Sequence, residues 1–276
     1  LWITQRHRPW LKWLGVVMLL MVCLQGYMGA TRVDFNSLVR AFVHGIGGQL
    51  ILCGWIVIAA ALSRPWLSRL KATAKRERKH ATVALRWSVR VLLVLLLVQL
   101  TLGSAVRHFK ADKAIPDFPL VYGHVLPPMS QESLDDRYIA YHTIPMAITA
   151  EIAKEQGIVT NRSPQGDIVV ALSDVDLQYA HRFGAVVVCL LGLFVIIAAI
   201  RRSHDRSAVL APALIVLALF STQFALGVMT VLSETEPFLA TLHQATGAAL
   251  IATATWLAVR IHLAEYAAVT SPPATA

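Results

Sequence analysis

The stretch RFGAVVVCLLGLFVIIAAI, residues Arg182–Ile200, decides the class of fold. After its first residue it has eighteen positions without a charged side chain. A helix of about 20 apolar residues crosses the roughly 30 Å hydrocarbon core of a bilayer. Because every backbone N–H and C=O inside lipid needs an internal partner, we expect this run to be an α-helix rather than a strand.

Five further apolar runs of similar length lie along the 276-residue chain, which is 56% hydrophobic and has a mean hydropathy of +0.59. They are Trp13–Thr31, Ala41–Leu62, Trp87–Val106, Val209–Leu232 and Leu239–Ile261. A soluble domain of this length needs more polar surface than such a composition supplies. The sequence therefore predicts an all-α polytopic membrane protein with about six transmembrane helices.

The segments between the runs differ in charge. Ser63–Arg90 has nine basic residues and one acidic residue, and the short link Arg201–Arg206 is also basic. By contrast, Arg107–Ala180 has ten acidic and six basic residues. Short basic loops stay on the cytoplasmic side. We therefore expect a multi-pass protein of the cell membrane (inner or plasma membrane) with both termini in the cytoplasm.

The net charge of +9 is explained by these basic cytoplasmic loops, which would lie next to anionic membrane lipid. It does not indicate nucleic-acid binding, because the basic residues flank membrane spans rather than forming one basic face. The three cysteines, Cys23, Cys53 and Cys189, all lie inside predicted spans. They are interpreted as small apolar packing residues, not as an outer disulfide framework.

Three predicted spans share a Gln-x3-Gly motif near their outer ends. The motif occurs at Gln25–Gly29, Gln99–Gly103 and Gln223–Gly227. After each motif comes a span with a histidine near its outer start, at His44, His181 and His243 respectively. This internal repeat of helix, outer loop and helix places the three histidines at nearly the same depth.

An ionisable side chain inside a span is a functional hypothesis by default. The alternative is an interfacial histidine bonded to a carbonyl or a headgroup. Glycines one turn on, at Gly48 and Gly247, leave room for a broad, flat group, although small residues also allow close helix packing. Imidazoles in a helical bundle often hold heme iron. Zinc fits less well, since no cysteine or carboxylate shares this depth.

The long outer segment Arg107–Ala180 contains six prolines. Its Ile115–Gly123 stretch is expected to be ordered and rich in turns, because residues before proline avoid the helical region. Ile144–Gln156 has helical spacing and is predicted to lie along the membrane surface. We interpret the segment as an ordered lid. His108, directly after Arg107, is a candidate contact for an anionic group such as a propionate or a lipid headgroup.

These motifs together resemble the heme A synthase family over essentially the whole chain. Besides the Gln-x3-Gly helices, the resemblance is carried by Gly103–His108, Ile115–Gly123, Ala180–Arg182 and Leu242–Gln244. The resemblance implies eight spans in two pseudo-symmetric four-helix halves, each with two histidines for one heme. It also implies that one half holds heme b, while the other oxidises a methyl group of heme O to the formyl of heme A for cytochrome oxidase.

Carried over to this chain, the resemblance assigns His181 and His243 as axial ligands of the heme b iron. His44 would lie on the side of the substrate, heme O. Arg107 and Arg182 are further candidates for cofactor binding. The implied domains are residues 1–84, a partial N-terminal half, and residues 85–276, a complete C-terminal half with the outer loop 107–180. Heme O synthase and cytochrome oxidase assembly factors are candidate partners, and a homo-oligomer is a further candidate.

The sequence also departs from the family pattern. Its six spans match the family's last six, so we expect the first helix pair to be missing, with Leu1–Ile3 as the tail of a preceding span. That pair would carry the histidine facing His44 and a catalytic glutamate. The equivalent place before His181 holds Gln178, which cannot act as a general base. Ala114 and Val121 stand where the family has outer-loop cysteines.

Two other functions stay open at this point. A b-type cytochrome, or a degenerate heme-binding membrane protein without synthase activity, would keep the His181–His243 pair. A non-heme membrane scaffold or transporter would leave the histidines interfacial. Transporter sites usually lie near the bilayer midplane, whereas these histidines are predicted close to the outer face.

Overall fold

The computed structural model describes residues 8–63, 83–143, 150–155, 167–202 and 206–269, together with residues 2, 157 and 160–162. These residues are mainly helical, and the extended backbone among them is limited to two isolated bridges. The elements in chain order are α1 (Pro9–Asp34), α2 (Leu38–Leu62), α4 (Val83–His108), a 3-10 turn η1 (Ala111–Lys113), α5 (Gln131–Thr143), α6 (Ala150–Glu155), α7 (Leu172–Arg202), α8 (Arg206–Leu232) and α9 (Pro237–Val269).

All six predicted spans are helices, which confirms the all-α membrane fold. Five of them, α1, α2, α4, α7 and α8, are long and apolar enough to cross a membrane. The sixth, predicted at Leu239–Ile261, lies in α9, which is 33 residues long but falls outside that set by its more polar composition. Helix α7 begins ten residues before the predicted start. The prediction followed the apolar run, and the first three turns of α7 are too polar to belong to it.

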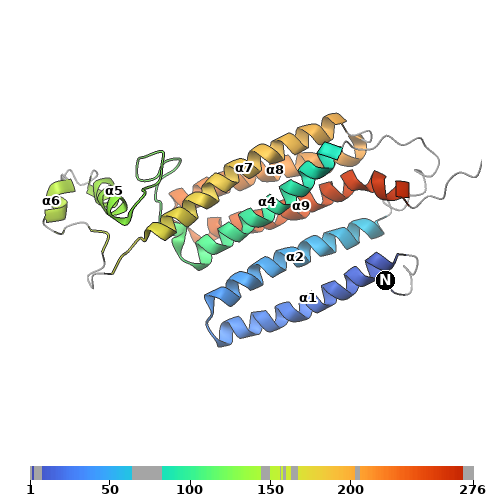
Figure 1. The fold of residues 1–276 in the computed structure, drawn as a ribbon, viewed down its shortest axis with the longest axis horizontal. Helices are drawn as coiled ribbons and strands as arrows, with labels where there is room; N and C mark the ends of the chain where they lie inside the picture. Colours follow the sequence, from blue (N-terminus) through green and yellow to red (C-terminus); the bar gives the residue numbers. More distant parts are fainter. Residues whose placement is uncertain are drawn as a thin grey trace, which may run out of the picture. The chain divides into compact units, whose positions relative to one another are not determined.

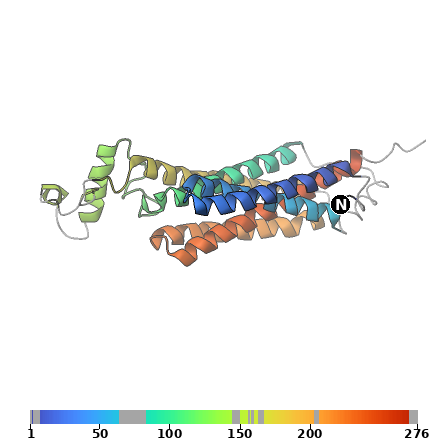
Figure 2. The same cartoon turned by 90° about the horizontal axis from the view of Figure 1, so that it is seen from below.

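The chain divides into two compact units. Unit 1 comprises Leu1–Thr101, Val186–Gln223 and Gln244–Ala276, and unit 2 comprises Leu102–Ala185 and Phe224–His243. In unit 1, α4, α7, α8 and α9 run side by side (Figures 1 and 2) and share one hydrophobic core. Leu92, Val195, Val216 and Leu257 are fully buried in it. This core is the four-helix bundle expected from the sequence.

Helices α1 and α2 form an antiparallel hairpin within unit 1 (Figure 1). Leu11, Met18, Ile58 and Ala61 make its small core. The guanidinium of Arg8 donates a 3.0 Å hydrogen bond to the carbonyl of Ala61. This bond joins the residue before α1 to the last turn of α2. The sequence prepares both starts, since Pro9 occupies the first turn of α1 and the Ser37 hydroxyl caps α2.

Helices α1, α4 and α8 end in the same way. In each, the residue eleven positions after the glutamine of the repeated motif, two positions beyond the last helical residue, is in the left-handed region. These residues are Asn36 (φ 43°), Lys110 (φ 60°) and Glu234 (φ 54°). The residue before each donates its N–H to the carbonyl four residues back in all three helices. The repeat read from the sequence is therefore a structural repeat, and it extends to the helix ends.

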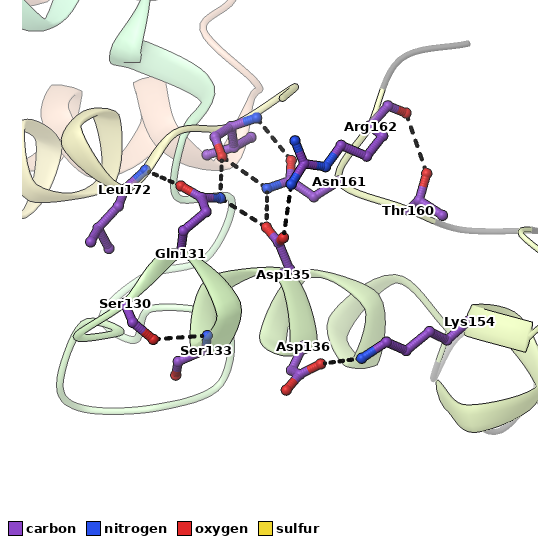
Figure 3. A network of polar contacts seen from close by, with 11 residues as sticks. Ser130, Gln131, Ser133, Asp135, Asp136, Lys154, Thr160, Asn161, Arg162 and Leu172 are labelled. Atoms are coloured by element: carbon purple, nitrogen blue, oxygen red, sulfur yellow. Dashed lines mark hydrogen bonds and ion pairs between the residues drawn. The ribbon is translucent and has the colours of Figure 1, made fainter. Parts of the chain in front are cut away.

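The outer part of unit 2 has its own core beneath α5. Ile115, Val121, Tyr122, Leu134 and Val175 are buried in it. A polar network joins α5 to the chain before α7 (Figure 3). Its hydrogen bonds run between Gln131, Asp135, Asn161, Val170 and Leu172. The predicted order of the outer segment is confirmed for these residues. Of the predicted helix Ile144–Gln156, residues 150–155 are helical, and the rest lies outside the described part.

Candidate functional site

Each repeated histidine lies against the glycine of the helix that precedes it in the repeat. A Cβ placed on Gly29 would lie 3.1 Å from Cε1 of His44. The equivalent distance is 2.8 Å from Gly103 to His181 and 3.0 Å from Gly227 to His243. Carbon atoms in van der Waals contact are separated by about 3.5–4.0 Å. A methyl group on Gly103 would therefore force the ring or a helix to move, and one on Gly29 or Gly227 would require the ring to shift by a few tenths of an ångström.

The three rings also adopt the same pose. In each, Cε1 is the atom closest to the glycine, and the two ring nitrogens flank it at 3.5 to 3.8 Å from the point that a Cβ would occupy. In each contact the imidazole therefore approaches the glycine with Cε1 nearest, and Nδ1 and Nε2 lie at nearly equal distances behind it.

The glutamine of the repeat makes the reciprocal contact. A methyl group on Gly47 would collide with the amide of Gln25, and one on Gly247 would lie 3.3 Å from Nε2 of Gln223. Gly48 is four residues after His44, as Gly247 is after His243, and it faces open space. The contact with the glutamine is made by Gly47, three residues after His44, in the first pair and by Gly247 in the last.

Several polar atoms on the α1–α2 hairpin are buried without a hydrogen bond. They are Oε1 of Gln25, Nδ1 of His44 and Oε1 of Gln49. An unsatisfied buried polar atom is costly, and more so in a membrane, where no water can replace the missing partner. An imidazole nitrogen is also a strong ligand for heme iron. The residues present around His44 are chemically suited to a polar or metal-containing group beside this hairpin.

Arg182, one residue after His181, holds the turn-rich loop of the outer segment. Its guanidinium donates to the carbonyls of Asp117 (2.8 Å), Leu120 (3.2 Å) and Ile115 (2.9 Å). The remaining Nε is buried and has no hydrogen-bond partner in the described residues. The structure therefore gives Arg182 a use that the sequence did not indicate. Its predicted cofactor contact stays a prediction, as does that of Arg107, whose side chain is exposed.

Gln178, one turn before His181, is almost fully buried, with 3% of its surface exposed. Its Oε1 accepts a 2.6 Å hydrogen bond from the N–H of Ile115, and its Nε2 donates to the carbonyl of Asp112 at 3.2 Å. Both ends of the amide thus bind the loop backbone. Gln178 and Arg182 are four residues apart, so they lie on one face of α7. Their spacing, opposite a proline-rich loop, was the signal that sequence reasoning missed.

We expect Gln178→Glu to destabilise unit 2 by about 1–3 kcal/mol at neutral pH, because a carboxylate cannot donate to the Asp112 carbonyl. Burial raises the pKa of such a carboxyl, so the penalty is full above that pKa and disappears as the pH falls below it. Melting temperatures measured in detergent from about pH 5 to pH 8 test this. A variant as stable as the parent at pH 8 would contradict the assignment.

Tyr122 anchors the other side of the loop. Its buried hydroxyl donates a 2.6 Å hydrogen bond to the carbonyl of Ala114. The carboxylate of Asp117 accepts from the N–H groups of Tyr122 and Gly123 at 2.8 and 2.7 Å. Burial raises the pKa of Tyr122 above its ordinary value, and the nearby Tyr138 hydroxyl and Asp117 carboxylate raise it further. The hydroxyl is therefore neutral across the physiological range.

The raised pKa of Tyr122 makes the stability of unit 2 sensitive to alkali. Above about pH 10 the unfolded tyrosine loses its proton while the folded one keeps it, so stability falls as the pH rises. Tyr122→Phe is expected to remove this dependence and to cost about 1 kcal/mol at neutral pH. Melting curves and tyrosinate absorbance measured together provide the test. Tyr27→Phe, at an exposed position, is the control and should keep the parent's alkaline profile.

Comparison with known proteins agrees with this arrangement. Residues 1–255 match the COX15-CtaA family, described as cytochrome oxidase assembly protein. A curated relative from Chelativorans sp. (strain BNC1), named heme A synthase, is 27% identical over 261 residues. This match covers 94% of the chain but only 63% of the relative's length.

The family match covers more than nine-tenths of the sequence and includes all three histidines and their glycines. It agrees with the resemblance read from the order of the motifs. The chain belongs to the COX15-CtaA family of cytochrome oxidase assembly proteins, the heme A synthase family.

Proposed function

We propose that this protein acts in heme A synthesis as an oxidoreductase that converts a methyl group of heme O to the formyl group of heme A. The main observation behind the proposal is that His44, His181 and His243 each contact the glycine of a Gln-x3-Gly motif in the same way. Family membership and the name of the matched relative support the same reaction.

His181 and His243 are proposed to hold heme b, each by one ring nitrogen. Neutral imidazoles are common axial ligands of heme iron, and both residues lie in unit 2 with their glycines. When bound, heme supplies one-electron and oxygen chemistry, and the protein supplies binding, orientation and electrostatics. The glycine helices fix the rings, and the loop held by Gln178 and Arg182 limits access of water at this end of α7.

His44 is proposed to face the substrate, heme O. Its ring has the same pose as the other two, and its Nδ1 is buried without a hydrogen-bond partner in the described residues. The amide of Gln178 is fully used by the loop, which supports a structural rather than a proton-transferring role for it. Arg107 remains a candidate for an anionic group of the cofactor, since it lies at the end of α4.

The charge pattern supports a plasma-membrane or inner-membrane location with both termini in the cytoplasm. Arg201 at the end of α7 and Arg86 and Arg90 near the start of α4 are basic residues at the helix ends that the charge rule assigns to the cytoplasm. The division into residues 1–84 and 85–276 is part of this proposal. Heme O synthase and cytochrome oxidase assembly factors are its proposed partners, and a homo-oligomer is a further candidate.

The activity is tested in a host that lacks its own heme A synthase and contains heme O. Hemes extracted after expression of the gene that encodes this chain are separated by chromatography. Appearance of heme A supports the proposal, and its absence contradicts it. Bound heme b without any heme A would instead favour a b-type cytochrome, the second candidate that the His181–His243 pair supports.

A further inference from the structure

We propose that Gly29, Gly103 and Gly227 are positioning residues that set the rotation of the three imidazoles. The inference rests on the proposed role of these histidines as heme ligands. It assigns a role to the glycines themselves, because the absence of a side chain at each lets Cε1 of the ring come close to the helix.

The closeness of the contact carries the first step. A methyl group at Gly103 would lie 2.8 Å from Cε1 of His181, well inside van der Waals distance. A long, flexible side chain could move its far end away from such a methyl. An imidazole cannot, because its ring is rigid and has only two rotatable bonds, so a methyl group must turn the ring or push the helices apart.

The repetition carries the second step. The three closest distances agree within 0.3 Å, and Cε1 is the nearest atom of the ring each time. The three contacts come from helix pairs with unrelated connections, since α1–α2 and α8–α9 are joined by short turns and α4–α7 by residues 109–171. A pose that persists through such different connections is a property of the glycine–histidine pair.

Close helix packing is the competing explanation for glycines in membrane helices. Other glycines of the same helices separate the two explanations. Gly26 and Gly48 have open space where a Cβ would be, and the methyl positions of Gly54 and Gly192 meet Met18 and Phe220. Among the glycines of the described spans whose surroundings are known, those that meet an imidazole are the three of the Gln-x3-Gly motif.

The orientation of a ligating imidazole ring affects measurable properties of the bound heme. The groups that hold a ligating histidine tune the metal, and disturbing them typically lowers metal affinity by about 10–100-fold. The angle between two axial imidazole planes also governs the electron paramagnetic resonance spectrum of low-spin ferric heme. A rotated ring is therefore visible even when both histidines stay bound.

The experiment uses the purified chain with heme b, in parent form and as Gly103→Ala and Gly227→Ala. Both variants are expected to shift the low-spin ferric resonance and to weaken heme binding by about tenfold or more. Gly26→Ala and Gly48→Ala should match the parent in both properties. Gly192→Ala, which crowds Phe220, is the control for general packing damage and should lower the melting temperature without moving the resonance.

A second variant pair guards against misfolding. In a His181→Ala background the methyl at Gly103 meets no ring, so Gly103→Ala should leave the melting temperature unchanged or raise it, since alanine favours helix. Parent-like spectra in both single variants, or equal damage by Gly103→Ala with and without His181, would overturn the inference. A parent protein that binds no heme overturns the proposed function instead, and the stability comparison still tests the contact.

Discussion

Replacing His181 with alanine is expected to abolish bound heme b, with a loss of more than about 90% of the pyridine hemochrome signal per protein. An axial ligand contributes directly to the iron bond, and alanine at this position supplies no donor. His243→Ala should have the same effect, because the two residues form the proposed pair. The helices should remain, since neither histidine belongs to the apolar core of α4, α7, α8 and α9.

The matched control is His124→Ala. His124 is exposed on the outer loop, and its hydrogen bonds to Val121 are made by the backbone. It should retain the full b-type spectrum. If the parent chain and all three variants give the same spectrum, the heme is held elsewhere and the axial assignment is wrong.

Replacing Arg182 with methionine is expected to open the loop of residues 115–120 and to destabilise unit 2 by about 3 kcal/mol. Hydrogen bonds to a charged group contribute about 1.5–3 kcal/mol each, and three carbonyls lose their donor at once. Methionine keeps the apolar length of the side chain, so the loss reports the hydrogen bonds rather than the packing.

Limited proteolysis with trypsin measures this directly, because Lys110 and Lys113 lie just before the loop and are exposed. Cleavage there should be at least about tenfold faster in Arg182→Met, since every 1.4 kcal/mol of opening free energy is a factor of ten. Arg137→Met is the control. Arg137 donates one exposed hydrogen bond, to the carbonyl of Leu126, and its loss should change the cleavage rate little. Equal rates in the two variants would mean that Arg182 does not hold the loop.

The helices were predicted well from the sequence because a membrane span has a simple sequence pattern. A run of apolar residues the length of the bilayer has almost no alternative to a helix. The ends were less accurate where a helix continues beyond the apolar run. In α7 the turns before His181 carry Asp174, Asp176 and Gln178, so hydropathy gives no sign that they are helical.

The candidate site was predicted in part. The Gln-x3-Gly repeat identified the histidines and their glycines, but a spacing rule cannot show that a glycine lies under a ring. Gly103 and His181 are 78 positions apart, and only folding brings them together. Nor does the equal spacing of Gly48 and Gly247 from their histidines show that Gly47 meets Gln25, because one position along a helix is a rotation of about 100°.

The role of Gln178 and Arg182 could be read from the sequence only in part. Their four-residue spacing places them on one face of α7, but both bind backbone carbonyls or N–H groups, and backbone partners leave no residue pattern that identifies the loop. The sequence suggested cofactor binding for Arg182 because it is a charged residue next to a proposed ligand. In the structure its guanidinium donates to three backbone carbonyls.

The shared ends of α1, α4 and α8 bear on how such a chain arose. A left-handed residue follows each helix eleven positions after its glutamine, whether the connection has three residues (35–37), four residues (233–236) or the whole of residues 109–171. This is what a duplicated helical hairpin would produce if one copy later gained an insertion at its tip. Loop closure becomes only slowly more costly with length, so the ancestral turn could accept a small folded module without disturbing the helices it joins.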